Sequence, residues 1–453
     1  MTHFYAAGAP TLDTASVRIA RAVRGSVAES LAELSRDSAV SATTESRSLR
    51  NLARGCAVRA VDDHVGQLAA EGEATPTETE VNESVGLVLA MLFGLGLLQR
   101  YVDDPNVENI DVTGAERAFV TYSDGRKELV GPIAESDEEL VSMVRAAAAR
   151  FGLAERRFDS AQPELDLRLP DGSRLSAVMG VTERPVVDIR RHRLPDYTLA
   201  DLTELGMLSE DLAAFLAAAV RAKRNILVSG AMNTGKTTLL RALAAEIAPS
   251  ERIVTIEQAL ELGLDKQRDR HPDCVAMEAR LANSEGIGAI GMAQLVRRSL
   301  RMNASRVIVG EVLGDEVIPM LNAMSQGRSG SMGTIHADSS AGVFRRLAAY
   351  AVQAPEHLPL EATNLLIAGA VHLVLHIDAV TTPDEPPLRQ IASVREVVDA
   401  EGPLVVSNEI WRPDASGRAR LGAPLRDTTV ALLASNGYAE RSRNGSTTAR
   451  VWA

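Results

Sequence analysis

The most informative segment of the chain reads Asn225-Ile226-Leu227-Val228-Ser229-Gly230-Ala231-Met232-Asn233-Thr234-Gly235-Lys236-Thr237-Thr238. Its first five residues predict a buried strand, and the pattern after Thr238 predicts a helix that continues to Ile247. Glycines at both ends of the turn allow successive backbone N–H groups to point at a bound phosphate, and the helix N-terminus adds partial positive charge. Strand, turn and helix together predict a phosphate-binding loop (P-loop) rather than a chance glycine-rich turn.

The P-loop prediction assigns a role to each side chain that follows the strand. Lys236 is expected to reach the β- and γ-phosphates of ATP and to take part in catalysis. Thr237 is expected to place its hydroxyl on Mg²⁺, and Thr238 to support the α-phosphate side. The predicted nucleotide contacts are Gly230, Ala231, Met232, Asn233, Thr234, Gly235, Lys236, Thr237 and Thr238.

Two carboxylates and a histidine follow other predicted strands. The run 306–310 predicts a strand that ends at Glu311, and the run 252–256 predicts one that ends at Glu257. Because ligands of open α/β sheets bind at the carboxyl ends of the strands, Glu311 is predicted to orient the attacking water or to hold a water on Mg²⁺. Glu257 is the second catalytic candidate, and His336 is a candidate sensor of the γ-phosphate. The alternatives are surface glutamates and a structural histidine.

The pattern of apolar residues predicts three regions. Residues 201–453 alternate β-branched runs with helical patterns, which is typical of an α/β domain with a parallel sheet, here with a C-terminal extension. Residues 81–200 mix short strands with a capped helix and predict a smaller α+β domain. Residues 1–80 predict a helical region that ends in a Thr- and Glu-rich linker at residues 71–80.

Composition limits the classes of function. The chain has 453 residues, 45% of them hydrophobic, and a net charge of -12, so it is expected to be globular and to be repelled by phosphate backbones. Two cysteines are too few for a disulfide framework and fit a reducing compartment. The longest apolar run, residues 85–98, is shorter than the roughly 18 residues of a membrane-spanning helix and predicts a buried helix. With no signal peptide evident, we expect a cytoplasmic protein that meets a membrane only through partners.

With these motifs in place, the chain resembles the type II and type IV secretion ATPases, and most closely the CpaF-type ATPases of Tad pili. The resemblance covers roughly residues 81 to 440. Besides the P-loop, the matching stretches are residues 92–98, 169–174, 255–257, 261–262, 306–312 and 333–337.

The resemblance implies a RecA-like P-loop domain, over which the preceding domain closes on ATP and Mg²⁺, and six subunits in a ring. Hydrolysis would then act on an inner-membrane platform protein that assembles a pilus or exports protein, at the cytoplasmic face of the membrane. In the family's terms, Glu311 ends the Walker B strand, Glu257 lies in the aspartate box and His336 is the second histidine of the histidine box. Three arginines match those that reach the phosphates from the N-terminal domain, with plain surface charge as the alternative: Arg174, Arg190 and Arg191.

Four residues depart from the family pattern: Gln258, Leu313, Arg328 and Ser329. With these departures, the prediction of nucleotide binding is better supported than the prediction of hydrolysis. A nucleotide-binding regulator with little turnover is therefore one alternative. A nucleic-acid translocase is another, with residues 190–193 as its basic patch. The negative charge and an aromatic content of 3% argue against the translocase, because single-strand grooves offer positive potential and stacking rings.

Overall fold

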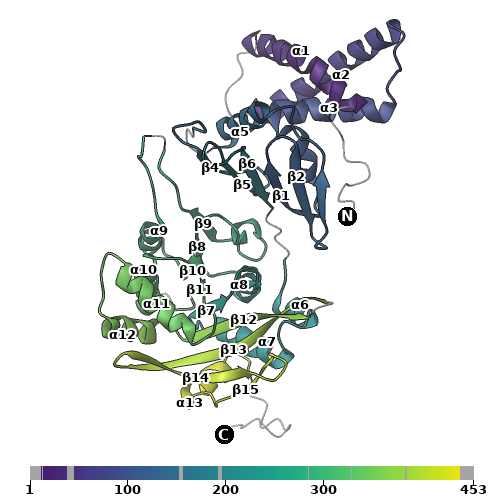
Figure 1. The fold of residues 1–453 in the computed structure, drawn as a ribbon. Coiled ribbons are helices and arrows are strands. Elements are labelled where there is room, and N and C mark those ends of the chain that lie inside the picture. The colour runs from purple at the N-terminus through teal and green to yellow at the C-terminus, as the bar shows by residue number, and fades with distance from the viewer. Residues whose placement is uncertain are drawn as a thin grey trace. The chain divides into compact units, whose positions relative to one another are not determined.

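The structure is a computed structural model that describes residues 12, 14–37, 45–152, 157–191, 196–283, 285–327, 329–382 and 385–438 (Figure 1). The chain divides into two compact units. The first comprises Met1–Arg193 with Asn283–Glu285, and the second comprises Leu194–Ala282 with Gly286–Ala453.

The first unit begins with three helices that pack together: α1 (Ala15–Asp37), α2 (Glu45–Ala70) and α3 (Glu78–Phe93). Their contact buries Val23 and Val27 of α1, Val61 of α2, and Val88 of α3. Helix α3 begins inside the predicted linker 71–80, which is therefore wrong in its last three residues. The cause is a capping box, in which the Thr77 side chain accepts from the Glu80 N–H and the Glu80 carboxylate accepts from the Thr77 N–H.

An antiparallel sheet follows in the first unit. Its described residues form six strands in the order β3-β2-β1-β6-β5-β4. Burial alternates along β4 and β5, so one face of the sheet packs on a core and the other is exposed. The elements are η1 (Gly96–Leu98), α4 (Gln99–Asp103), β1 (Val107–Thr113), β2 (Arg117–Tyr122), β3 (Lys127–Val130), α5 (Asp137–Phe151), β4 (Glu164–Arg168), β5 (Arg174–Val178) and β6 (Val186–Arg190).

The described residues of the second unit form a nine-stranded sheet in the order β15-β14-β13-β12-β7-β11-β10-β8-β9. The strands from β12 to β9 pair in parallel, and β13, β14 and β15 extend the sheet antiparallel beyond β12. The strands are β7 (Ile226–Gly230), β8 (Ile253–Glu257), β9 (Cys274–Glu278), β10 (Arg306–Val312), β11 (Met332–His336), β12 (Leu373–Thr382), β13 (Glu385–Glu401), β14 (Leu404–Pro413) and β15 (Ala419–Leu421). The predicted parallel α/β sheet is thus confirmed.

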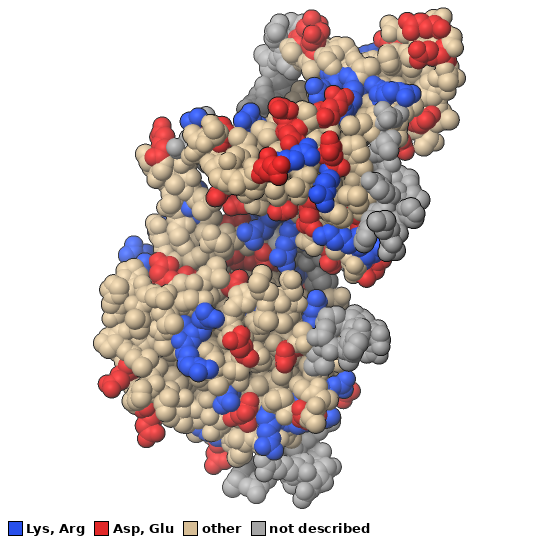
Figure 2. All heavy atoms as spheres, in the orientation of Figure 1, with Lys and Arg blue, Asp and Glu red and all other residues tan. Residues whose placement is uncertain are grey.

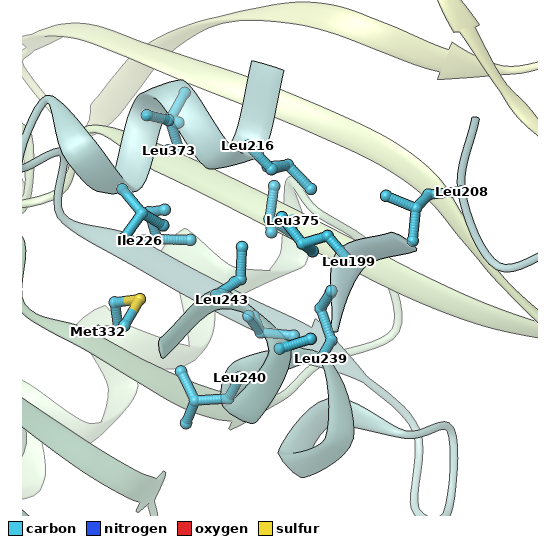
Figure 3. Packing of buried hydrophobic residues seen from close by; sticks show 14 of the residues in the cluster. Leu199, Leu208, Leu216, Ile226, Leu239, Leu240, Leu243, Met332, Leu373 and Leu375 are labelled. Atoms are coloured by element: carbon cyan, nitrogen blue, oxygen red, sulfur yellow. The ribbon is translucent and has the colours of Figure 1, made fainter. Parts of the chain in front are cut away.

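Helices cover this sheet and bury its central strands. Every residue of β7 and β8 is buried, as expected for parallel strands covered on both faces. Figure 3 shows Leu239, Leu240 and Leu243 of α8 together with Ile226 and Leu375 of the sheet in one apolar cluster. The helices are α6 (Leu199–Glu204), α7 (Glu210–Arg221), α8 (Lys236–Ala244), η2 (Leu264–Lys266), α9 (Met292–Ser299), α10 (Val317–Ser325), α11 (Gly342–Gln353), α12 (Leu360–Ala370) and α13 (Asp427–Ala434).

Two surface features bear on the sequence predictions. Among the described residues no single helix is long and apolar enough to cross a membrane, and one pair, α3 with the segment Gly96–Asp103, meets that length and composition only across a 118° bend. The apolar run 85–98 is therefore not the continuous helix predicted, because α3 ends at Phe93. On the face drawn in Figure 2, acidic and basic side chains of the described residues are mixed.

Candidate active site

The P-loop joins β7 to α8 in the second unit. Gly235 precedes Lys236, the first residue of α8, with φ of 94°, a left-handed conformation that favours glycine. Thr234 is buried, and its hydroxyl donates to the carbonyl oxygen of Ala231 at 2.9 Å, which closes the turn on itself. Met232 lies at the tip and is 73% exposed. The base of the loop is therefore fixed by a hydrogen bond, and its tip is open to solvent.

Lys236 folds back into the loop. Its ammonium donates to the carbonyl oxygens of Gly230 at 3.1 Å and Ala231 at 2.7 Å, and the side chain is buried. Burial lowers the pKa of Lys236, while the negative charge of Glu311 opposes that shift. The loop thus holds a cation at its centre.

His336 connects Lys236 to Glu311. The Lys236 Nζ lies 3.3 Å from Nδ1 of His336, and Nε2 of the same ring lies 2.6 Å from Oε1 of Glu311. Because an ammonium has donors alone, Nδ1 accepts and the ring proton sits on Nε2, facing the carboxylate. The Nε2 contact has the distance of an ion pair without the alignment of a hydrogen bond, so Oε1 accepts no hydrogen bond in the described residues.

This grouping follows from the parallel pairing of the strands. His336 is the last residue of β11 and lies opposite Gly230 of β7, while Glu311 lies on the neighbouring strand β10. Parallel strands bring their carboxyl ends to one edge of the sheet, so residues distant in sequence meet there. Three of the predicted catalytic residues, Lys236, Glu311 and His336, are thereby brought together.

Glu257, the fourth, ends β8 on the other side of β10. It is 2% exposed, and Oε1 accepts from the N–H groups of Glu261 and Leu262, each at 2.8 Å, whereas Oε2 has no partner in the described residues. Burial raises the pKa of Glu257 to about 7, against the lowering effect of those two N–H groups. A carboxyl group of that pKa accepts or releases a proton near neutrality.

Gly310 makes room for Glu257. A Cβ atom at Gly310 would lie 2.8 Å from Cγ of Glu257, closer than real Cβ contacts allow. Because Gly310 has no side chain, the Glu257 carboxylate can lie against β10, the strand that carries Glu311.

The remaining predicted residues divide between the units. Thr237 and Thr238 lie half-buried in the first turn of α8, and Asn233 has φ of 59° in the exposed part of the loop. The other three predicted contacts are arginines of the first unit. Arg174 and Arg190 lie opposite each other on β5 and β6, and Arg191 lies 3.7 Å from Asp171 through Nε. These arginines and the P-loop belong to different units, so the approach of the arginines to the phosphates of ATP stays a prediction.

Two supporting residues went unrecognised in the sequence. His376 is buried in β12, and its Nδ1 lies 3.0 Å from the hydroxyl of Ser229, directly before the P-loop. Burial lowers the pKa of His376. Asn225 is fully buried, and its side chain bonds the backbone at Met324, Ala370, Gly330 and Ser331. In the sequence, the only sign of this role was a polar residue directly before an apolar strand, and that pattern does not indicate which groups Asn225 contacts. The departure at Arg328 lies outside the described residues.

The chain is similar to proteins of bacterial secretion and conjugation systems. The family model described as "Type II/IV secretion system protein" matches residues 93–399. A Mycobacterium tuberculosis relative named for conjugal transfer is 34% identical over 77% of this chain and 97% of its own length. The type IV secretion system protein VirB11 of Brucella suis is 29% identical over 63% of this chain and 84% of its own. Its crystal structure with sulphate aligns with a TM-score of 0.36 at 27% identity, covering 66% of this chain and 92% of that one.

Proposed function

The chain belongs to the type II/IV secretion system protein family, as its sequence predicted, and we propose that its P-loop and the Lys236–His336–Glu311 group hydrolyse ATP. The protein is an ATPase motor of type IV secretion or pilus systems; the VirB11 relative of Brucella suis is an ATPase of a type IV secretion system. The observation that carries the proposal is the position of Lys236, buried inside the P-loop and beside His336, which in turn contacts Glu311. A closer likeness to the Tad-pilus ATPases stays a prediction.

Lys236 exchanges partners when nucleotide binds. Its ammonium leaves the carbonyl oxygens of Gly230 and Ala231 for the β- and γ-phosphate oxygens, where a charge-assisted hydrogen bond is stronger. The exchange also opens the inward-facing N–H groups of the loop to the phosphates. Binding therefore requires the side chain to move within its own loop, at little cost to the rest of the fold.

Glu311 and His336 act on the bond that breaks. Water attacks the γ-phosphorus, the bond from that phosphorus to the bridging oxygen breaks, and ADP and phosphate form. Glu311 orients the water by accepting its proton in a hydrogen bond, and His336 turns its Nε2–H from Glu311 to a γ-phosphate oxygen. Glu257, with a pKa of about 7, is the reserve proton acceptor at the same strand edge.

The oxygen donors of the site suit Mg²⁺. The described residues contain no group of three or more His, Cys, Asp or Glu side chains that could hold a metal. Mg²⁺ in nucleotide sites usually has one or two protein oxygens beside phosphates and waters. Thr237 and Glu311, whose Oε1 accepts no hydrogen bond, would hold it directly or through water. When bound, the ion neutralises charge that develops on the β- and γ-oxygens.

The assembled state is a further part of the proposal. Six subunits form a ring at the cytoplasmic face of the membrane, and hydrolysis acts on a membrane platform protein of the secretion or pilus system. Arg174, Arg190 and Arg191 approach the phosphates when the first unit closes over the second. Because an arginine supplied to phosphoryl transfer is worth about 10³- to 10⁵-fold in rate, separate subunits hydrolyse slowly. Electron microscopy of the nucleotide-bound chain tests the ring directly.

Phosphate release by the purified chain with Mg²⁺ and ATP tests the reaction. We expect Lys236→Ala to abolish release and Glu311→Gln to stop turnover while a fluorescent ATP analogue still binds. Lys266→Ala and Glu361→Gln, which change the same residue types outside the site, should leave both measurements within about twofold. Phosphate release that persists in Lys236→Ala would remove the assignment of the P-loop.

A further inference from the structure

A closed ring of polar side chains includes Ser340, in the turn that follows His336. Four residues after His336, the hydroxyl of Ser340 lies 2.7 Å from that of Ser393 on β13. Ser393 donates to Oε1 of Glu409 on β14 at 2.6 Å, and Nε of Arg395 donates to Ser340 at 2.9 Å. Nη2 of Arg395 lies 3.3 Å from Oε2 of Glu409, which closes the ring.

The direction of every hydrogen bond in this ring follows from the chemistry. The Glu409 carboxylate accepts, so Ser393 uses its one hydroxyl hydrogen there. The hydrogen between the two serines therefore belongs to Ser340, whose oxygen is free to accept from Arg395. Ser340 and Ser393 are 2% and 4% exposed, and a hydrogen-bonded network in such surroundings is stiff because its members strengthen one another.

The ring is attached to the site at two points. The turn 337–341 is fixed at one end by the pairing of His336 with Gly230 and at the other by Ser340. Ser393 lies directly opposite His376 in the β12–β13 pairing, and His376 contacts Ser229 beneath the P-loop. The histidine turn and the P-loop strand thus have a common support in the antiparallel strands, which carry none of the predicted catalytic residues.

We propose that the ring of Ser340, Ser393, Arg395 and Glu409 positions His336 for hydrolysis, with Arg395 as its principal positioning residue. The inference rests on the proposed function, because it concerns the same histidine. Arg395 does not touch the nucleotide. It holds the turn after β11 so that the His336 ring faces Lys236 through Nδ1 and Glu311 through Nε2. Without the ring, the turn retains its fold but loses the orientation of the imidazole.

The test compares Arg395→Met and Ser393→Ala with Arg420→Met. Arg420 lies on β15 in the same antiparallel extension and pairs with Asp414 at the surface, so its loss is the matched control. We expect Arg395→Met and Ser393→Ala to lower kcat roughly ten- to a hundredfold, as misplacing a reacting group does, with the KM for ATP changed less than twofold. Ser393→Thr, which keeps the hydroxyl, should restore most of the rate.

A second measurement shows whether the effect passes through His336. In a His336→Ala background, adding Ser393→Ala should change kcat less than twofold; a full additional loss would overturn the proposal. In ¹⁵N-histidine NMR spectra of the full chain, the His336 signal, identified by its loss in His336→Ala, should shift in Arg395→Met and not in Arg420→Met. If the signal shifts while the wild-type chain releases no Lys236-dependent phosphate, the proposed function fails and the positioning stands. If the wild type hydrolyses ATP but Arg395→Met changes neither the His336 signal nor kcat, the proposal that the ring positions His336 is wrong.

Discussion

The antiparallel sheet of the first unit and the parallel strands of the second use polar residues differently. In the first, burial alternates along β4, β5 and β6, and charged residues such as the pair of Lys127 and Asp111 lie exposed. In the second, β7 and β8 are buried throughout, and their ionisable residues stand at strand ends, as Glu257 does. Antiparallel neighbours end at opposite edges, whereas parallel neighbours end together. A parallel sheet therefore gathers reactive groups at one edge, where burial changes their chemistry.

The largest effect is expected at the opposite edge of the parallel strands. Arg306, at the start of β10, has a side chain 1% exposed that pairs with Glu251 at 2.7 Å. Arg306→Met removes the guanidinium from Glu251, which keeps its ion pair with Lys223 at 3.1 Å, and from the carbonyl oxygens of Val220 and Gly330. Losing one partner of a buried pair and a buried hydrogen-bond donor should lower the free energy of unfolding by about 3 to 5 kcal/mol. Urea unfolding followed by the fluorescence of Trp411, which is 2% exposed in this unit, measures the loss. Adding Trp452→Phe to both the wild type and Arg306→Met leaves Trp411 as the fluorescent reporter. A loss below 1 kcal/mol would contradict the comparison.

Glu257 makes stability depend on pH. Its folded pKa of about 7 lies above the usual 4.5, so the folded chain binds that proton more tightly than the unfolded chain. The stabilisation is fully present below about pH 4.5 and is lost as pH rises through about 7, by up to about 3 kcal/mol. The unfolding free energy of the wild type should thus fall across this window relative to Glu257→Gln, which does not titrate. If the unfolding free energies of the wild type and Glu257→Gln change in parallel with pH, the pKa of Glu257 is not raised by folding.

Gly310→Ala should affect the rate more than the fold. Its new Cβ would push Glu257 away from the strand that carries Glu311, and kcat should fall by on the order of 10²-fold. Gly314→Ala is the matched control, because nothing lies within 4 Å of a Cβ at that position. Its kcat should stay within about twofold of wild type. Equal rates in the two variants would show that the close approach of Gly310 and Glu257 has no part in catalysis.

The smallest effect is expected in the antiparallel sheet. Lys127 pairs with Asp111 at 2.8 Å, but the two side chains are 50% and 42% exposed. Lys127→Met should change the free energy of unfolding by less than about 1 kcal/mol, because water and salt screen such a pair. Urea unfolding followed by circular dichroism checks this. A change as large as that of Arg306→Met would remove the difference between the two sheets.

Much of the fold was predictable because the relevant signals are local. The capped helix predicted within residues 81–200 is α5, and the predicted strand 306–310 is the first part of β10. Each of these depends on the period of apolar residues and on a cap a few positions away. Boundaries that depend on packing were missed: α3 begins within the predicted linker and ends before the predicted apolar run does.

By itself, the sequence determined the P-loop, the order of helices and strands around it, and the residues that could carry the chemistry, because glycine-rich turns and apolar periods are written in neighbouring residues. The tertiary structure alone decided which of those residues meet. Lys236 and His336 are 100 positions apart, and Ser340 and Ser393 are 53 apart. No local pattern specifies such pairs: strand order and register set them, and those depend on how the whole sheet buries its apolar surface.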